Sequence, residues 1–218
     1  MRIDPAEVAR LILEGQAPPE DWIPHIVELR LERSYITNLR QVSLLTGLRT
    51  LLLTRSRISD IAPLAALTGL QRLHLSFTAV RDLAPLADMA NLEACFLTGS
   101  LVDDIAPLAG LTRLERLDLG DTRITDAMPL IGLRNLRSLD LSATRVADIA
   151  PLASLTALQF LDLTGTPVTD LTPLVALTNL RWLIMRNTHA DVSPLSRLVG
   201  CHVITAVQVP RRARHRHA

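Results

Sequence analysis

The stretch "LRSLDLSATRVADIAPLASLT", residues Leu136–Thr156, places a charged Asp140 between Leu139 and Leu141 in an otherwise apolar run. Side chains alternate between the two faces of a β-strand, so neighbours along a strand point to opposite sides. In a strand through "LDL" the two leucines face the core and the aspartate faces outward. We therefore expect Asp140 to stand on the open face of a sheet.

The same unit recurs along most of the chain with a spacing of 22 residues, as from Leu114 to Leu136. A period sustained over this length is typical of a solenoid, in which each repeat buries its apolar side against its neighbours. The sequence predicts eight repeats and then a ninth strand. The repeats begin at Ile26, Leu48, Leu70, Leu92, Leu114, Leu136, Leu158 and Leu180.

The recurring pattern "LxxLxLxxTxIxDIxPLxxL" resembles the leucine-rich repeat family, and is most similar to the 22-residue bacterial type found in internalins. The resemblance implies an α/β-type leucine-rich repeat solenoid with a parallel concave β-sheet of about nine strands. It also implies short 3₁₀ or irregular turns on the convex side. Internalins are secreted adhesins, whereas the start of this chain lacks the pattern of a signal peptide.

The chain divides into three segments at this stage. Residues 1–25 are expected to form an N-terminal helical cap, with Asp4 as its N-cap and Gly15 as its stop. Residues 26–207 form the solenoid, whose last strand is expected to turn Ile204 inward and Thr205 outward. Residues 208–218 form a basic tail that is predicted to be disordered.

Two polar ladders are interpreted as scaffold. A hydroxyl stands at the ninth position of each repeat, where it can bond backbone groups as the chain leaves the strand. An Asp or Asn stands at the thirteenth position, or at the twelfth in the shorter last repeat, and can cap the amides of the following turn. The two ladders are Ser34, Ser56, Thr78, Ser100, Thr122, Thr144, Thr166 and Thr188, and Asn38, Asp60, Asp82, Asp104, Asp126, Asp148, Asp170 and Asp191.

Composition and motifs do not favour catalysis or charge-driven binding. The net charge of +1 gives no overall attraction to nucleic acid or to an anionic membrane. The chain contains no lysine, which excludes Schiff-base and lysine general-base chemistry. No catalytic constellation, cofactor motif or metal motif occurs, and no apolar run is long enough to span a membrane. We expect a non-enzymatic, cytoplasmic protein that needs no cofactor.

At the outward positions of the sheet the residue type differs from one repeat to the next, and these are the candidate binding residues. They form an apolar zone, then stacked carboxylates, and then a far apolar end. Exposed apolar and aromatic groups of this kind mark interaction sites. The predicted partner-binding residues are Leu52, His74, Phe77, Phe96, Leu101, Asp118, Asp121, Asp140, Asp162, Phe160 and Trp182.

The column of Asp118, Asp140 and Asp162 has three possible explanations. Like charges on neighbouring strands repel, so their repulsion must be reduced by solvent, by positive charges or by a bound cation. Solvent together with Arg116, Arg123 and Arg145 is the simplest explanation, a basic patch on a partner is the second, and a bound Ca²⁺ is the third. A single column offers too few converging ligands for a tight metal site.

The leading functional hypothesis is a protein-interaction module that binds a protein or peptide on its concave face. The alternatives are a self-associating structural protein, with Phe160, Trp182 and the last strand as the contact, and a bacterial effector acting on a host protein. Nucleic-acid binding is expected at most through the basic tail, and the chain is expected to be a monomer or a weak homo-oligomer.

Overall fold

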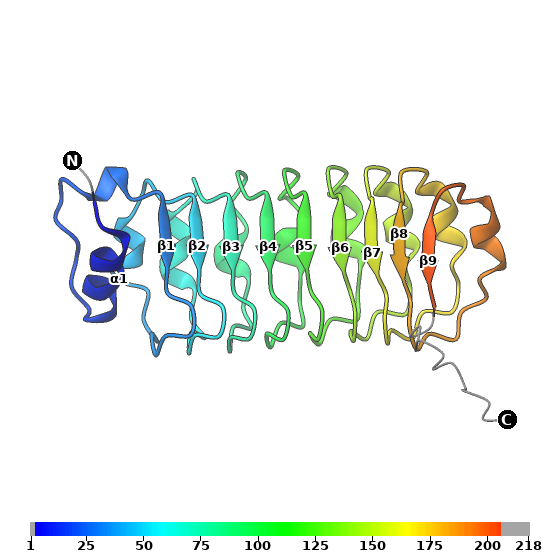
Figure 1. The fold of residues 1–218 in the computed structure, drawn as a ribbon, viewed down its shortest axis with the longest axis horizontal. Coiled ribbons are helices and arrows are strands. Elements are labelled where there is room, and N and C mark those ends of the chain that lie inside the picture. Colours follow the sequence, from blue (N-terminus) through cyan, green and yellow to red (C-terminus); the bar gives the residue numbers. More distant parts are fainter. Residues whose placement is uncertain (1–2, 206–218) are drawn as a thin grey trace, which may run out of the picture.

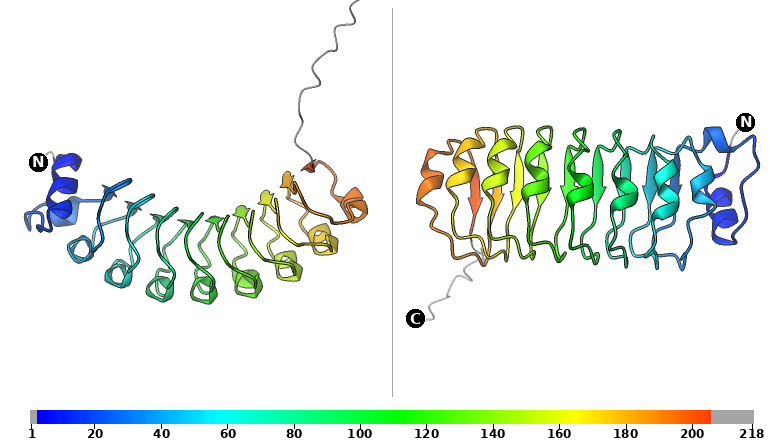
Figure 2. Two further views of the ribbon diagram at one scale, coloured as in Figure 1. Left: turned by 90° about the horizontal axis from the view of Figure 1, so that it is seen from below. Right: turned by 180° about the vertical axis from the view of Figure 1, so that it is seen from behind.

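The computed structural model describes residues 3–205 and shows a curved solenoid, with helix α1 at one end and strand β9 at the other (Figures 1 and 2). The described residues form one nine-stranded sheet in which each strand pairs in parallel with the next along the chain. The strands are β1 (Glu28–Arg30), β2 (Thr50–Leu52), β3 (Arg72–His74), β4 (Ala94–Phe96), β5 (Arg116–Asp118), β6 (Ser138–Asp140), β7 (Phe160–Asp162), β8 (Trp182–Ile184) and β9 (His202–Ile204).

Short 3₁₀ helices line the convex side, where the left view of Figure 2 shows them on the outer edge of the arc. From η2 to η9 there is one in each repeat, and from η3 onward a proline occupies the first turn of each. Because proline has a fixed φ and no N–H, it suits a first turn whose N–H groups lack helical partners. The helices are η1 (Ile23–His25), η2 (Val42–Leu44), η3 (Ala62–Ala66), η4 (Ala84–Leu86), η5 (Ala106–Leu108), η6 (Met128–Gly132), η7 (Ala150–Ser154), η8 (Thr172–Ala176) and η9 (Ser193–Arg197).

The alternation predicted for "LDL" is confirmed. Leu139 and Leu141 are fully buried, and Asp140 between them is only partly covered. The register pairs Leu139 with Leu117 on one side and with Leu161 on the other, so equivalent leucines stack along the solenoid. Burying one such side chain contributes about 1.5–3 kcal/mol, which makes the stacked leucines the main source of stability.

The ninth-position hydroxyls bond the backbone in six of the eight repeats. Thr122 Oγ1 donates to the carbonyl oxygen of Leu119 at 2.6 Å, and Thr144 makes the same bond to Leu141. Ser56 and Ser100 are buried but have no hydrogen-bond partner within the described residues. The remaining four bonds are donated by Ser34, Thr78, Thr166 and Thr188.

The thirteenth-position ladder is confirmed in all eight repeats. Each side-chain oxygen accepts a hydrogen bond from the backbone N–H two residues later, as Asp148 does from Ala150 at 2.8 Å. The bond lies within a single repeat and caps the turn that leads into the 3₁₀ helix. The other bonds join Asn38 to Arg40, Asp60 to Ala62, Asp82 to Ala84, Asp104 to Ala106, Asp126 to Met128, Asp170 to Thr172 and Asp191 to Ser193.

The N-terminal cap forms as predicted. Helix α1 spans Pro5–Leu13, and the Asp4 carboxylate accepts a hydrogen bond from the N–H of Ala6. Val8 and Ile12 are buried against the core, and α1 packs beside β1. The cap therefore covers the open end of the first repeat. None of the helices in residues 3–205 is long and apolar enough to cross a membrane.

The prediction for the last strand is wrong by one residue. The register pairs Leu183 with Val203 and Ile184 with Ile204, so Ile204 rather than Thr205 continues the outward column. The N–H of Cys201 still donates to Leu198, as the first residue of earlier repeats donates to its equivalent. The chain is therefore one residue shorter between Cys201 and the strand. The prediction for residues 208–218 lies outside the described residues.

Candidate functional site on the concave face

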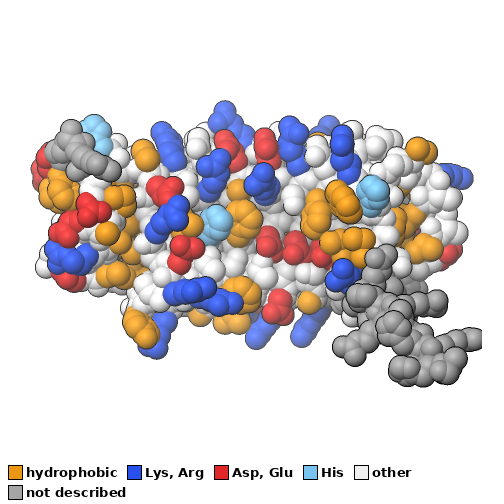
Figure 3. All heavy atoms as spheres, viewed as in Figure 1, with side chains coloured by type: hydrophobic (Ala, Val, Ile, Leu, Met, Phe, Trp, Pro, Cys, Tyr) orange, Lys and Arg blue, Asp and Glu red, His pale blue; other side chains and the backbone are white. Residues whose placement is uncertain are grey.

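The eleven predicted binding residues fall into two structural groups. Eight lie on strands with outward side chains, namely Leu52, His74, Phe96, Asp118, Asp140, Asp162, Phe160 and Trp182. Phe77, Leu101 and Asp121 lie in the loops that leave the strands, at the rim of the concave face. Figure 3 shows this side of the molecule, where acidic side chains form a short row with hydrophobic groups on both sides.

An aromatic stack forms the centre of the apolar patch, which we define as Leu52, His74, Phe77, Phe96 and Leu101. The rings of His74 and Phe96 lie on neighbouring strands with centroids 4.2 Å apart and planes inclined by 22°. Burial lowers the pKa of His74, which favours the neutral form of the imidazole. The patch therefore presents a flat, preformed aromatic surface.

Phe77 is held in an unusual backbone conformation. Its φ is +56°, in the left-handed region, and its side chain is 47% exposed. The guanidinium of Arg55 lies 5.1 Å from the centre of its ring. A Cβ on Gly99 would come within 2.6 Å of the same ring, so the glycine of the next repeat provides the space that the ring occupies. The sequence places Arg55 and Gly99 at the eighth position, one repeat away from Phe77, but their contact with its ring was not predicted.

The acidic row, which we define as Asp118, Asp140 and Asp162, has a structural role that the sequence analysis missed. The three aspartates are in register on β5, β6 and β7. Each carboxylate accepts a hydrogen bond from the N–H two residues later, and the donors are Gly120, Ser142 and Thr164. An aspartate at the end of each strand therefore caps its own turn, which is a reason for the repeated "LDL" that requires no ligand.

The charge of the acidic row is not paired inside the described structure. Ion pairs in residues 3–205 join Arg10 to Glu7 and Glu14, Arg30 to Glu28, Arg81 to Asp103 and Arg137 to Glu115. The expected neutralisation by Arg116, Arg123 and Arg145 is therefore not seen as ion pairing. Burial raises the pKa of Asp140, and the charges of Asp118 and Asp162 raise it further, against hydrogen bonds from Ser142 that lower it.

The far end of the sheet carries a second aromatic group. Phe160 and Trp182 are neighbours in register on β7 and β8, and the indole of Trp182 stacks on His202 with ring centroids 4.6 Å apart. Trp182 is 46% exposed. Aromatic surface therefore lies on both sides of the acidic row.

Arginines at the N-terminal end of the sheet are already engaged. Arg30 pairs with Glu28, and the guanidinium of Arg57 lies 4.7 Å from the centre of the exposed Tyr35 ring. The guanidinium of Arg55 lies over the ring of Phe77. Arg55 and Arg57 keep their positive charge in these contacts, because an aromatic ring does not neutralise a guanidinium.

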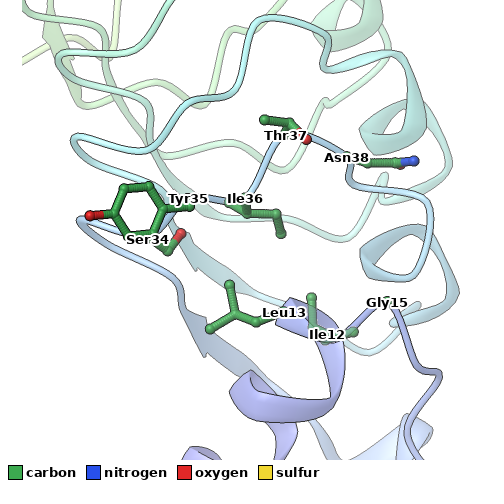
Figure 4. Close-up of a pocket in the computed structure, with 8 residues that line it drawn as sticks. All are labelled: Ile12, Leu13, Gly15, Ser34, Tyr35, Ile36, Thr37 and Asn38. Carbon is green, nitrogen blue, oxygen red and sulfur yellow. The ribbon is translucent and has the colours of Figure 1, made fainter.

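A pocket of about 420 Å³ lies away from the concave face, between α1 and the first repeat (Figure 4). Leu13 of α1 and Ile36 of the repeat border it, and Tyr35 lies beside them. It marks the junction of cap and solenoid. No group of three or more His, Cys, Asp or Glu side chains within residues 3–205 is arranged to hold a metal ion. The absence of a tight calcium site stays a prediction.

The buried cysteine does not offer a nucleophile at neutral pH. Cys95 lies in the core, where burial raises the pKa of its thiol to about 12. Because the thiolate is the reactive form, this side chain is inert while the protein is folded. Cys201 lies partly buried at the far end of the core.

Comparison with known proteins agrees with the repeat pattern. Residues 134–176 match the family model described as leucine-rich repeats in two copies. A comparison with curated protein sequences gave no match. The structure of internalin C2 from Listeria monocytogenes superimposes with a TM-score of 0.83 and 29% identity, over 91% of each chain.

Two further solved structures share the fold. An internalin, inlF, from Listeria monocytogenes has a TM-score of 0.73 and 26% identity, over 91% of this chain and 67% of its own. A leucine-rich repeat protein from Leptospira interrogans has a TM-score of 0.66 and 18% identity, over 86% of this chain and 57% of its own, which shows a common fold only. The repeat and the fold show a leucine-rich repeat solenoid with 22-residue repeats, and these similarities make it similar to the internalins.

Proposed function

We propose that the chain is a non-enzymatic interaction module that binds a protein or peptide on its concave face. The leucine-rich repeat fold supports this, because internalin-like members of the family generally serve protein–protein interaction. We further propose that binding centres on the apolar patch, with the acidic row and Asp121 setting the charge preference and Phe160 and Trp182 extending the contact.

The observation that carries the proposal is the exposed ring of Phe77. Phe77 takes the left-handed conformation that recurs at the eighth position of each repeat, where a bulky side chain is disfavoured, and it is 47% exposed. Exposed aromatic side chains of this kind mark interaction sites. Together with the stacked His74 and Phe96, Phe77 forms a preorganised aromatic surface, which lowers the entropy cost of binding.

The test is the double variant Phe77→Ala with Phe96→Ala, compared with the wild type in a pull-down from the native lysate and in thermal melting. Truncating central aromatic anchors typically costs about 2 kcal/mol or more in binding. We expect the captured protein to be lost while cooperative melting persists, because both rings face outward.

The matched control is Met128→Ala with Ile131→Ala, two apolar residues on η6 that are 54% and 50% exposed on the convex side. This variant should retain the captured protein. A Phe77/Phe96 variant that melts cooperatively and still captures the same protein would place the site elsewhere.

Self-association is the second candidate, supported by the apolar end of the solenoid. Val199 is 95% exposed and Val203 is 37% exposed, beside the Trp182–His202 stack. Solenoid ends of this kind need a cover. Mass measurement in solution across a range of concentrations tests it, and a monomer at all concentrations would exclude it. The cytoplasmic location and the effector alternative stay predictions, which cell fractionation would test.

A further inference from the structure

The concave face from β5 to β9 is an unpartnered sheet face with a defined order of side chains. The acidic row occupies the last residues of β5, β6 and β7. The same column continues through Ile184 on β8 to Ile204 on β9. Moving away from β9, this column is therefore apolar over two strands and then acidic over three.

The segment that follows β9 carries side chains in the matching order. Residues 206–218 lie outside the described structure, and their sequence begins with "AVQVP", in which Val207 and Val209 are apolar. It then carries four arginines and two histidines within the last eight residues, at Arg211, Arg212, Arg214, His215, Arg216 and His217. Without these arginines the net charge of +1 becomes 1 − 4 = −3, so the two parts of the chain are opposite in sign.

We propose that residues 206–218 bind back onto the concave face of the same chain. Val207 and Val209 would cover Ile184 and Ile204, and the arginines would lie against the acidic row. Arginine suits this position because its planar guanidinium donates to two carboxylate oxygens at once. The aspartates keep acceptor capacity for such contacts, since each carboxylate has about four lone-pair sites and the backbone N–H uses one.

The segment is long enough for this contact. Neighbouring strands lie about 4.8 Å apart, so Asp162 is about 10 Å from Ile204 across the sheet and Asp118 is about 19 Å away. An extended chain covers about 3.3 Å per residue, which gives about 23 Å from Ile204 to Arg211 and about 40 Å to Arg216. The arginines can therefore reach every member of the acidic row with chain to spare for a turn.

Attachment to the chain makes the contact favourable without a tight interface. A segment tethered this closely has an effective concentration in the millimolar range at its target. The contact is mainly electrostatic and exposed, so salt should weaken it. It would cover part of the surface that we propose for a partner, and a partner would have to displace it. The contact itself can be measured without any partner, so its test does not depend on the proposed function.

The test measures the distance between the segment and the sheet in the full chain. A nitroxide label is attached to Ala218→Cys in a Cys201→Ser background, since Cys95 is buried and inert. Paramagnetic broadening of backbone amide signals is then recorded at low salt. We expect signals of Gly120, Ser142 and Thr164, next to the acidic row, to lose about half or more of their intensity, while amides of η6 and η7 on the convex side keep theirs.

Two variants distinguish the proposed contact from random encounters. Replacing all three aspartates of the row by Asn removes the charge but keeps an oxygen that can accept the capping hydrogen bond, so the fold should persist and the broadening should disappear. Replacing Arg211, Arg212, Arg214 and Arg216 by Gln should have the same effect without touching the solenoid. The control replaces Glu20, Asp21 and Asp88 by their amides, which removes three exposed charges that lie outside the strands and make no ion pair within residues 3–205, and should leave the broadening unchanged.

Three results would overturn the proposal. The first is broadening spread evenly over both faces, or none at all. The second is broadening that survives in both the aspartate and the arginine variants. The third is broadening in a mixture of labelled unenriched chains and unlabelled ¹⁵N-enriched chains, which would mean that the segment binds a second copy instead.

Discussion

At the scale of single residues, the eighth position of the repeat shows a conflict between backbone and side chain. Its φ is positive in every repeat, between +53° and +68°. Gly99, Gly165, Asn187 and Asp121 suit this conformation, because glycine lacks a Cβ and Asn and Asp tolerate the left-handed region. Phe77 and Ala143 do not suit it. The fold imposes the conformation, and each unsuitable residue therefore costs stability.

This conflict predicts that Ala143→Gly stabilises the protein. Relief of the left-handed strain should raise the free energy of unfolding by about 1 kcal/mol, since glycine adopts this region freely. Urea unfolding at equilibrium measures the change. For the same reason Phe77→Gly should be more stable than Phe77→Ala by about 1 kcal/mol, although both lose the ring. Equal stabilities in that pair would mean that the conformation carries no strain.

At the scale of the structural element, the turn after the strand contains a hydroxyl–carbonyl hydrogen bond in six of the eight repeats. Thr122 and Thr144 satisfy the carbonyls of Leu119 and Leu141, whereas the hydroxyl of Ser100 is buried without a partner in the described structure. A buried polar group without a partner costs stability, and a buried hydrogen bond contributes to it. Equivalent positions in neighbouring repeats therefore differ in what their hydroxyls contribute.

The difference predicts opposite results for two similar substitutions. Thr122→Val keeps the shape but leaves the Leu119 carbonyl without its donor, and should lower the free energy of unfolding by about 1–3 kcal/mol. Ser100→Ala removes an unpaired hydroxyl and should change it by less than about 0.5 kcal/mol. Thr78→Val, whose hydroxyl makes the same bond to the Leu75 carbonyl, serves as the replicate of the first. Similar losses from Thr122→Val and Ser100→Ala in denaturant unfolding would contradict this account.

At the scale of the whole molecule, the two ends of the solenoid are unequal. At the first end α1 buries Val8 and Ile12 against the core, while at the other end Val203 of β9 is 37% exposed. Among the described residues β9 pairs with β8 alone. Repeats in a solenoid are stabilised mainly by their immediate neighbours, so an uncovered end opens more readily than the middle.

We therefore expect native-state hydrogen exchange to be fastest in β9, slower in β8, and slowest in β5 and β6. Strand β1 should be protected more than β9, because α1 covers it. The control is Ile12→Asp, which should weaken the cap and bring the exchange of β1 closer to that of β9 while β6 changes little. Uniform protection from β1 to β9 would contradict the nearest-neighbour account.

The fold could be predicted because the sequence patterns that indicate it occur in every repeat. The period and the alternation in "LDL" each occur many times, so a local irregularity such as Cys95 in place of leucine does not obscure them. The last strand was misplaced because Val203 and Ile204 are both apolar, and alternation cannot choose between them when one residue is missing before the strand. Register then depends on backbone pairing, which no side-chain pattern reports.

The surface was predicted less completely than the fold. The sequence analysis placed the acidic row outward but not its backbone bonds, although an aspartate two residues before a free N–H is a known turn pattern. The placement of Arg55 over Phe77 follows from both residues standing at the eighth position of adjacent repeats. The stacking of His74 on Phe96 depends on side-chain rotation, which spacing alone does not determine.

The capping bonds of the thirteenth-position ladder have a consequence for how such a chain can evolve. Each bond closes within its own repeat, as Asp148 does with Ala150, so duplication or loss of one 22-residue unit in the gene would leave every remaining cap intact. The number of repeats could then change without any change in the backbone hydrogen bonds that cap the turns. Each repeat inserted between β4 and β5 would move the aromatic stack away from the carboxylates by one strand spacing, about 4.8 Å. Selection on the number of repeats could therefore set the distance between these two contact surfaces.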